Sequence, residues 1–96
     1  MSSTSNPPKG HFKVLYFAGA SSFTGKDSET WPAPLPLSKL FAELESKYPG
    51  MQAKILDSCL VTVNLDYVDI PAPGDASAPV IQESDEVAII PPVSSG

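Results

Sequence analysis

The chain of 96 residues lacks the features that mark several large classes of protein. A single cysteine, Cys59, excludes an internal disulfide. No apolar run approaches the ~18 residues that a membrane-spanning helix needs. Only 6 Lys and Arg residues stand against 11 Asp and Glu residues, so the net charge is -5. This balance argues against binding to nucleic acid, which requires clustered cations on the protein. It suits a partner protein with a basic surface.

The first ten residues also lack the apolar stretch of a secretory signal, and Ser2 stands where myristoylation requires glycine. The segment is rich in Ser, Pro and Gly, so we predict that residues 1–10 form a disordered leader. The location that we expect is the cytoplasm.

The chain as a whole has the composition of a globular protein, with 42% hydrophobic and 18% charged residues. A chain of this length has room for a single modest core. We predict that this domain covers residues 11–90.

Two kinds of periodicity define its elements. Residues 11–18 alternate as a strand, with Phe12, Val14 and Tyr16 on one face. Phe17 lies on the other face, where a solvated sheet would carry polar groups. A helix is predicted before Pro49-Gly50, because a single apolar stripe runs through Leu37, Leu40, Phe41, Leu44 and Tyr48.

Shorter strands are predicted at 29–31, 60–64, 67–70 and 87–90, with a Pro-rich surface loop at 71–79. The fold class is therefore α+β, with a mixed sheet of four to five strands and one main helix packed on one of its faces. Because a crossover helix separates the first strand from the last part of the chain, we expect the first and last strands to pair in parallel. The last strand then lies at the centre of the sheet.

That last strand leads directly into a stiff C-terminal tail, residues 91–96. Pro91 and Pro92 restrict φ and favour an extended course, so six residues reach roughly 20 Å beyond the sheet. The tail ends on Gly96, which has no Cβ and leaves its carboxylate open to a partner. We predict that the tail is flexible and functional.

Three segments carry a resemblance to a known family: residues 13–18, Val63-Asn64 and above all residues 85–94. They resemble the small subunit of molybdopterin synthase, a ubiquitin-like β-grasp sulfur carrier. The resemblance spans about residues 12–96. It implies a β-grasp domain with an extended C-terminal tail.

The family resemblance also implies a chemistry. The carboxylate of Gly96 would be adenylated with ATP and magnesium by a partner resembling ubiquitin-activating enzymes, an adenylyltransferase and sulfurtransferase. It would then become a thiocarboxylate and donate sulfur to cyclic pyranopterin monophosphate, in molybdenum cofactor biosynthesis. The chain would be non-catalytic alone, with no permanently bound cofactor. It would complete a heterotetramer with the large synthase subunit.

Two groups of residues are expected to contact that large subunit. Phe17 and Ile90 are predicted to form an apolar docking patch on the outer face of the sheet. The alternative is that the chain itself covers this face. The second group is the tail that enters the partner, formed by Pro91, Pro92, Val93, Ser94 and Ser95.

Ser95 departs from the family pattern, which ends in two glycines, and it makes a positive φ costly at that position. Two other functions stay open. One is a ubiquitin-like modifier or a carrier for another sulfur pathway, such as tRNA thiolation or thiamine synthesis. The other is an inert interaction domain.

Three further features are interpreted as structural. Cys59 and His11 could form a nucleophile and base, but a lone cysteine beside a strand is more often a packing residue. The acidic run 83–86 is interpreted as a solvated turn and not as a metal site. Trp31 is expected to cap one end of the core.

Overall fold

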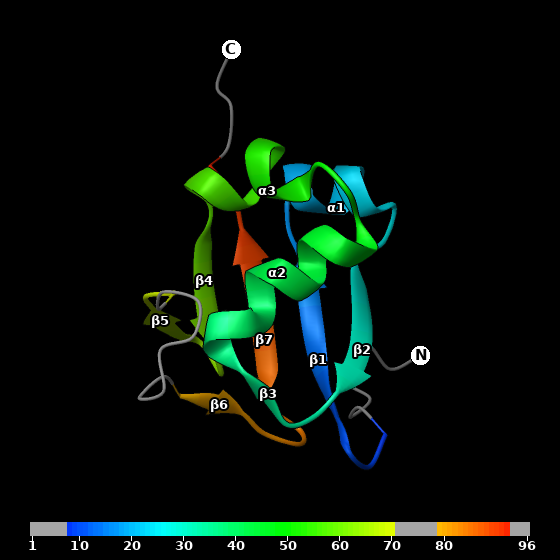
Figure 1. Cartoon of the computed structure of the whole chain (residues 1–96), viewed down its shortest axis with the longest axis vertical. Helices are drawn as coiled ribbons and strands as arrows, with labels where there is room; N and C mark the ends of the chain where they lie inside the picture. Colours follow the sequence, from blue (N-terminus) through cyan, green and yellow to red (C-terminus); the bar gives the residue numbers. More distant parts are fainter. Residues whose placement is uncertain (1–7, 71–78, 93–96) are drawn as a thin grey trace.

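The computed structural model describes residues 8–70 and 79–92 of the chain. Helices lie across one face of a five-stranded sheet, and a small two-stranded sheet lies at one end (Figure 1). The elements in chain order are β1 (His11–Tyr16), α1 (Gly19–Thr24), β2 (Ser28–Pro32), β3 (Leu35–Pro36), α2 (Leu37–Lys47), α3 (Met51–Lys54), the 3-10 turn η1 (Leu56–Ser58), β4 (Leu60–Val63), β5 (Asp66–Val68), β6 (Val80–Ile81) and β7 (Glu86–Ile90).

The main sheet has the strand order β2-β1-β7-β4-β5, so β7 is its central strand. β1 pairs with β7 in parallel, from Lys13 opposite Glu86 to Tyr16 opposite Ile89. The other pairs in this sheet are antiparallel. The predicted parallel pairing of the first and last strands is confirmed, as is the central place of the last strand.

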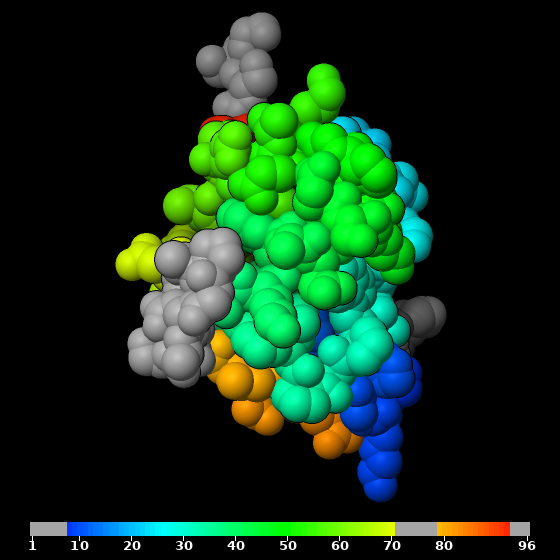
Figure 2. Space-filling model, viewed as in Figure 1, coloured from blue at the N-terminus to red at the C-terminus, as the bar shows by residue number. Residues whose placement is uncertain are grey.

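The core lies between the inner face of this sheet and α2. Phe12 and Val14 are fully buried on β1, as are Leu40 and Leu44 on α2. In the space-filling view, α2 and the segment after it cover this face of the molecule (Figure 2). The predicted apolar stripe therefore packs as expected, with Phe41 and Tyr48 half-buried at its margin. Trp31, 6% exposed, joins the same core from β2.

The structure differs from the sequence prediction at several elements, and β5 covers Asp66–Val68 where a strand was predicted at 67–70. β1 ends at Tyr16, two residues early, because Ala18 has φ 50° and turns the chain into α1. β3 and β6 were not predicted as strands, although Leu35 pairs with Ile81 and Pro36 with Val80. A two-residue strand has no detectable periodicity, and the prolines around β3 indicated a rigid link.

β1 begins at His11 and β7 ends at Ile90. Residues 1–7 and 93–96 lie outside the described ranges, so the division into leader, domain and tail stays a prediction. Residues 71–78 of the predicted surface loop also lie outside them. Within residues 8–70 and 79–92, no helix is long and apolar enough to cross a membrane.

Candidate functional site

The root of the tail lies at the end of the central strand. Ile90 is opposite Leu60 of β4 and is the last paired residue of β7. Pro91 follows and is buried, whereas Pro92 is exposed. Because proline has no backbone N–H to donate, sheet pairing stops here and the chain leaves the sheet at its centre. Gly96, with Val93, Ser94 and Ser95, lies outside the described residues, and their predicted roles stay predictions.

A shallow apolar depression of about 210 Å³ lies on the outer face of the sheet, opposite α2. Its apolar lining comes from Leu15, Phe17, Leu65, Tyr67, Ala88 and Ile90. Thr62 and Glu86 complete the lining. Large apolar side chains exposed to this extent on one face are typical of a surface that binds another protein.

The structure brings Phe17 and Ile90 together, as predicted. The backbone N–H of Phe17 donates to the carbonyl of Ile89 at 3.1 Å, which holds Phe17 beside the end of β7. Phe17 is 45% exposed and Ile90 is partly exposed, so the described part of the chain leaves this patch open. Both residues lie beside Pro91, where the chain leaves the sheet.

Sequence reasoning missed two residues of this face, Leu65 and Tyr67. They are 83% and 72% exposed and extend the depression toward the β4–β5 turn. The available signal was the alternation in β4 and β5, which puts Thr62 and its cross-strand partner Tyr67 on the same face. The strand pattern alone did not show whether that face looks inward or outward.

The comparisons with known proteins bear on this face and on the tail. The ThiS family matches residues 14–96 of the chain. The molybdopterin synthase sulfur carrier subunit of Phaeosphaeria nodorum is 62% identical over 93% of this chain and 94% of its own length. This chain belongs to the ThiS family. The human molybdopterin synthase sulfur carrier subunit is 36% identical over 93% of this chain and 98% of its own length. The resemblance to the small subunit of molybdopterin synthase is thus confirmed.

Two solved structures confirm the β-grasp fold of this ThiS family member. The small archaeal modifier protein 1 from Methanosarcina acetivorans superimposes with a TM-score of 0.68 at 20% identity, covering 94% of this chain and all of that one. A chain of the complex of subunits 1 and 2 of molybdopterin-converting factor from Helicobacter pylori gives 0.54 at 20% identity, covering 90% and 99%. In that complex, the related fold is bound to a second subunit.

Cys59 does not form a nucleophile and base pair with His11 in this ThiS family chain. His11 begins β1, whereas Cys59 precedes β4, whose start lies beside the far end of β7. The Cys59 thiol is half-buried and donates to the carbonyl of Leu56 at 3.5 Å. Burial raises its pKa to about 11, so the thiol stays protonated near neutral pH. Cys59 is a packing residue.

The acidic run 83–86 forms a hydrogen-bonded turn. A Glu83 oxygen accepts from the backbone N–H of Gly10 at 2.9 Å, and an Asp85 oxygen accepts from the N–H of Gln82 at 2.8 Å. In the part of the chain that the structure describes, no group of three or more His, Cys, Asp or Glu side chains could hold a metal ion.

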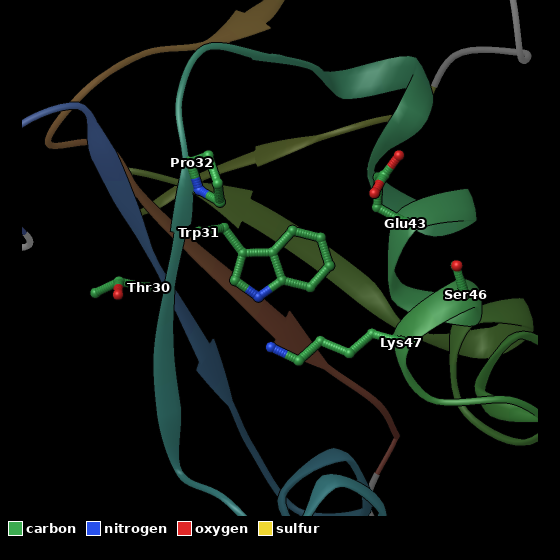
Figure 3. A pocket seen from close by; sticks show the side chains of 6 residues that line it. All are labelled: Thr30, Trp31, Pro32, Glu43, Ser46 and Lys47. Atoms are coloured by element: carbon green, nitrogen blue, oxygen red, sulfur yellow. The ribbon is translucent and has the colours of Figure 1, made fainter.

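A second cavity, of about 240 Å³, lies between β2 and α2 on the other side of the sheet. Trp31 projects into it from β2, and Lys47 extends from α2 along the indole ring (Figure 3). The Lys47 ammonium lies 5.6 Å from the centre of that ring and 2.8 Å from a Glu29 oxygen. These contacts hold the end of α2 against β2. We therefore interpret the cavity as a gap between two packed elements and not as a binding site.

Proposed function

We propose that this chain is the sulfur carrier subunit of molybdopterin synthase. The observation that carries the proposal is the 62% identity to a protein of that name over almost the whole of both chains. The site geometry supports it, because β7 delivers a Pro-Pro tail from the centre of the sheet beside an open apolar face. A carrier of this kind needs an accessible terminus and a docking surface, and it needs no catalytic side chain.

The proposed chemistry takes place on the Gly96 carboxylate. One carboxylate oxygen attacks the α-phosphorus of ATP on an activating adenylyltransferase, with magnesium, and pyrophosphate leaves. Sulfur from a persulfide donor then displaces AMP from the acyl carbon, and reduction of the resulting acyl disulfide by a thiol releases the thiocarboxylate. In the synthase, this sulfur is transferred to cyclic pyranopterin monophosphate, and water restores the carboxylate. Because glycine has no Cβ, both partners can close around the reacting carbon.

The partner that we propose for the outer face is the large synthase subunit. The related complex from Helicobacter pylori supports a two-subunit assembly. Phe17 and Ile90 would be buried at the tail root, and Pro91 to Ser95 would enter the partner as an extended arm. We propose a heterotetramer of two large and two small subunits, with the small subunits at its ends. We further propose a cytoplasmic location, since the activation step requires a compartment that supplies ATP.

Intact-mass spectrometry tests the proposal. The chain is incubated with ATP, magnesium, a competent activating enzyme and a sulfur source. We expect a mass increase equal to the replacement of one oxygen by sulfur, and no increase in a variant that lacks Gly96. A chain that gains no sulfur under these conditions, or one recovered joined to lysine amines through Gly96, would contradict the proposed function. The second result would favour a protein modifier instead.

A further inference from the structure

The turn between β4 and β5 has an unusual residue at its tip. Val63 pairs with Asp66, so the connection is the two-residue loop Asn64-Leu65. Both residues have positive φ, 52° and 74°. Two-residue hairpin turns of this kind favour asparagine at the first position and glycine at the second. Leucine is poorly suited to the second, because its Cβ crowds the backbone at positive φ.

This conformation is held in place from outside the turn. The backbone N–H of Asn64 donates to the carbonyl of Glu86 at 2.7 Å, and the Asn64 side-chain oxygen accepts from the N–H of Glu86 at 2.9 Å. The Asn64 amide nitrogen also donates to Asp85 at 3.0 Å. The turn is thus clamped to the start of β7, and Leu65 is presented in one fixed direction.

The Leu65 side chain buries little apolar surface against its own chain. It is 83% exposed, the highest value among the exposed large apolar side chains of the described residues. Leucine is unfavourable in this backbone conformation and contributes almost no burial here. The stability of the fold therefore does not explain why leucine occupies this position. Unfavourable backbone conformations of this kind cluster at binding and catalytic sites.

Leu65 lies on the rim of the outer depression, near Tyr67 and Glu86. Glu86 begins β7 and Ile90 ends it, so the turn and the tail root lie at opposite ends of the same face, roughly 13 Å apart along the strand. Contacts at both ends would fix the angle at which the carrier docks. In the proposed complex, that angle would decide where the tail meets the partner.

We propose that Leu65 is a docking anchor that inserts into an apolar pocket of the large synthase subunit. This inference rests on the proposed function and adds to it a second contact point, remote from the tail. The leucine side chain is buried only in the complex, and the unfavourable turn conformation is retained because Leu65 orients the carrier on its partner.

The test combines thermal unfolding with calorimetric binding to the large subunit for Leu65→Gly and Leu65→Asn. Both replacements suit a positive φ, so the melting temperature of the free chain should stay the same or rise. The Kd should rise about tenfold or more, as expected for the loss of one buried leucine. Leu65→Met should keep most of the affinity, because it retains an apolar side chain. Lys39→Ala, on the opposite face, should leave both values unchanged.

The outcomes separate this inference from the proposed function. If Leu65→Gly and Leu65→Asn bind the large subunit as tightly as the original chain does, the proposed role of Leu65 as an anchor is wrong and the proposed function stands. A melting temperature that falls together with affinity would mean a structural role and would also overturn the anchor. Leu65 variants that bind the large subunit normally but are adenylated slowly would also overturn the anchor, because Leu65 would then act at the activating enzyme. A large subunit that fails to bind the original chain would overturn both proposals.

Discussion

Ser95 precedes the glycine whose carboxylate carries the proposed chemistry. A serine at this position adds a Cβ and a hydroxyl where the partner enzymes must close around the chain. It also narrows the backbone conformations open to the tail, because a positive φ becomes costly. The ordinary β and polyproline conformations remain available to it, so we expect a handicap and not a loss of activity.

Replacing Ser95 by glycine should therefore raise the rate of thiocarboxylation several-fold. The measurement is the initial rate of sulfur incorporation by intact mass, at a limiting concentration of activating enzyme. Ser94→Gly serves as the matched control and should change the rate less, since it lies one residue further from the carboxylate. Equal rates for the original chain and Ser95→Gly would show that serine is no handicap.

At the scale of elements, the end of α2 is held to β2 by a charged cluster around Glu29. This side chain is 9% exposed and accepts hydrogen bonds from the hydroxyls of Tyr16 and Tyr48, the latter at 2.7 Å. Lys47 and Lys26 approach it at 2.8 and 3.3 Å. Burial alone would raise the pKa of Glu29, but these donors outweigh burial and lower it from 4.5 to about 2.

A carboxylate whose pKa is lower in the folded state stabilises the fold above its unfolded pKa, and that contribution is lost as the pH falls through the folded pKa. For Glu29 the window runs from about 4.5 down to about 2. Glu29→Gln should reduce the free energy of unfolding at pH 7 by roughly 1–3 kcal/mol, because the donors lose their charged acceptor. Urea unfolding of both proteins between pH 7 and pH 2 checks this.

The difference between the original chain and Glu29→Gln should shrink as the pH falls through this window. Glu43→Gln, on the exposed side of α2, is the control and should stay within about 0.5 kcal/mol of the original chain. A constant difference at every pH would show that the cluster acts through packing and not through charge.

At the scale of the whole molecule, the two faces of the sheet differ in what covers them within the described residues. α2 covers the inner face and closes the core, whereas the outer face carries Phe17, Tyr67 and Ile90 beside the tail root. If the outer face docks the large subunit as proposed, a mutation on it should impair assembly without unfolding the chain.

Phe17→Asp should raise the Kd for the large synthase subunit at least about tenfold, since it removes apolar burial and places a charge in the interface. Thermal stability should change little, because Phe17 is 45% exposed in the free chain. Calorimetry with the large subunit measures the first effect and circular dichroism the second. An unchanged Kd would contradict a docking role for this face.

Much of this protein follows from local patterns in the chain. Strand alternation in residues 11–16 and the stripe from Leu37 to Leu44 identified the two halves of the core, because each periodicity is a property of one element. The crossover helix predicted the parallel pairing of β1 and β7, and the proline pair after Ile90 predicted where sheet pairing ends. The outward position of Phe17 and Ile90 was predicted because apolar residues on that face interrupt a simple inside–outside pattern, and their docking role stays a prediction.

Other features depend on which elements meet, and no local pattern reports this. Glu29 meets Tyr16 only when β1 and β2 pair, and it meets Tyr48 and Lys47 only when α2 packs beside β2, so the lowered pKa has no signature in the sequence. In the sequence, Leu65 lies between the predicted strands 60–64 and 67–70 and has no distinguishing feature. Its proposed docking role is argued from a left-handed backbone clamped to β7 and from a side chain left exposed, and both result from strand register and packing between distant segments.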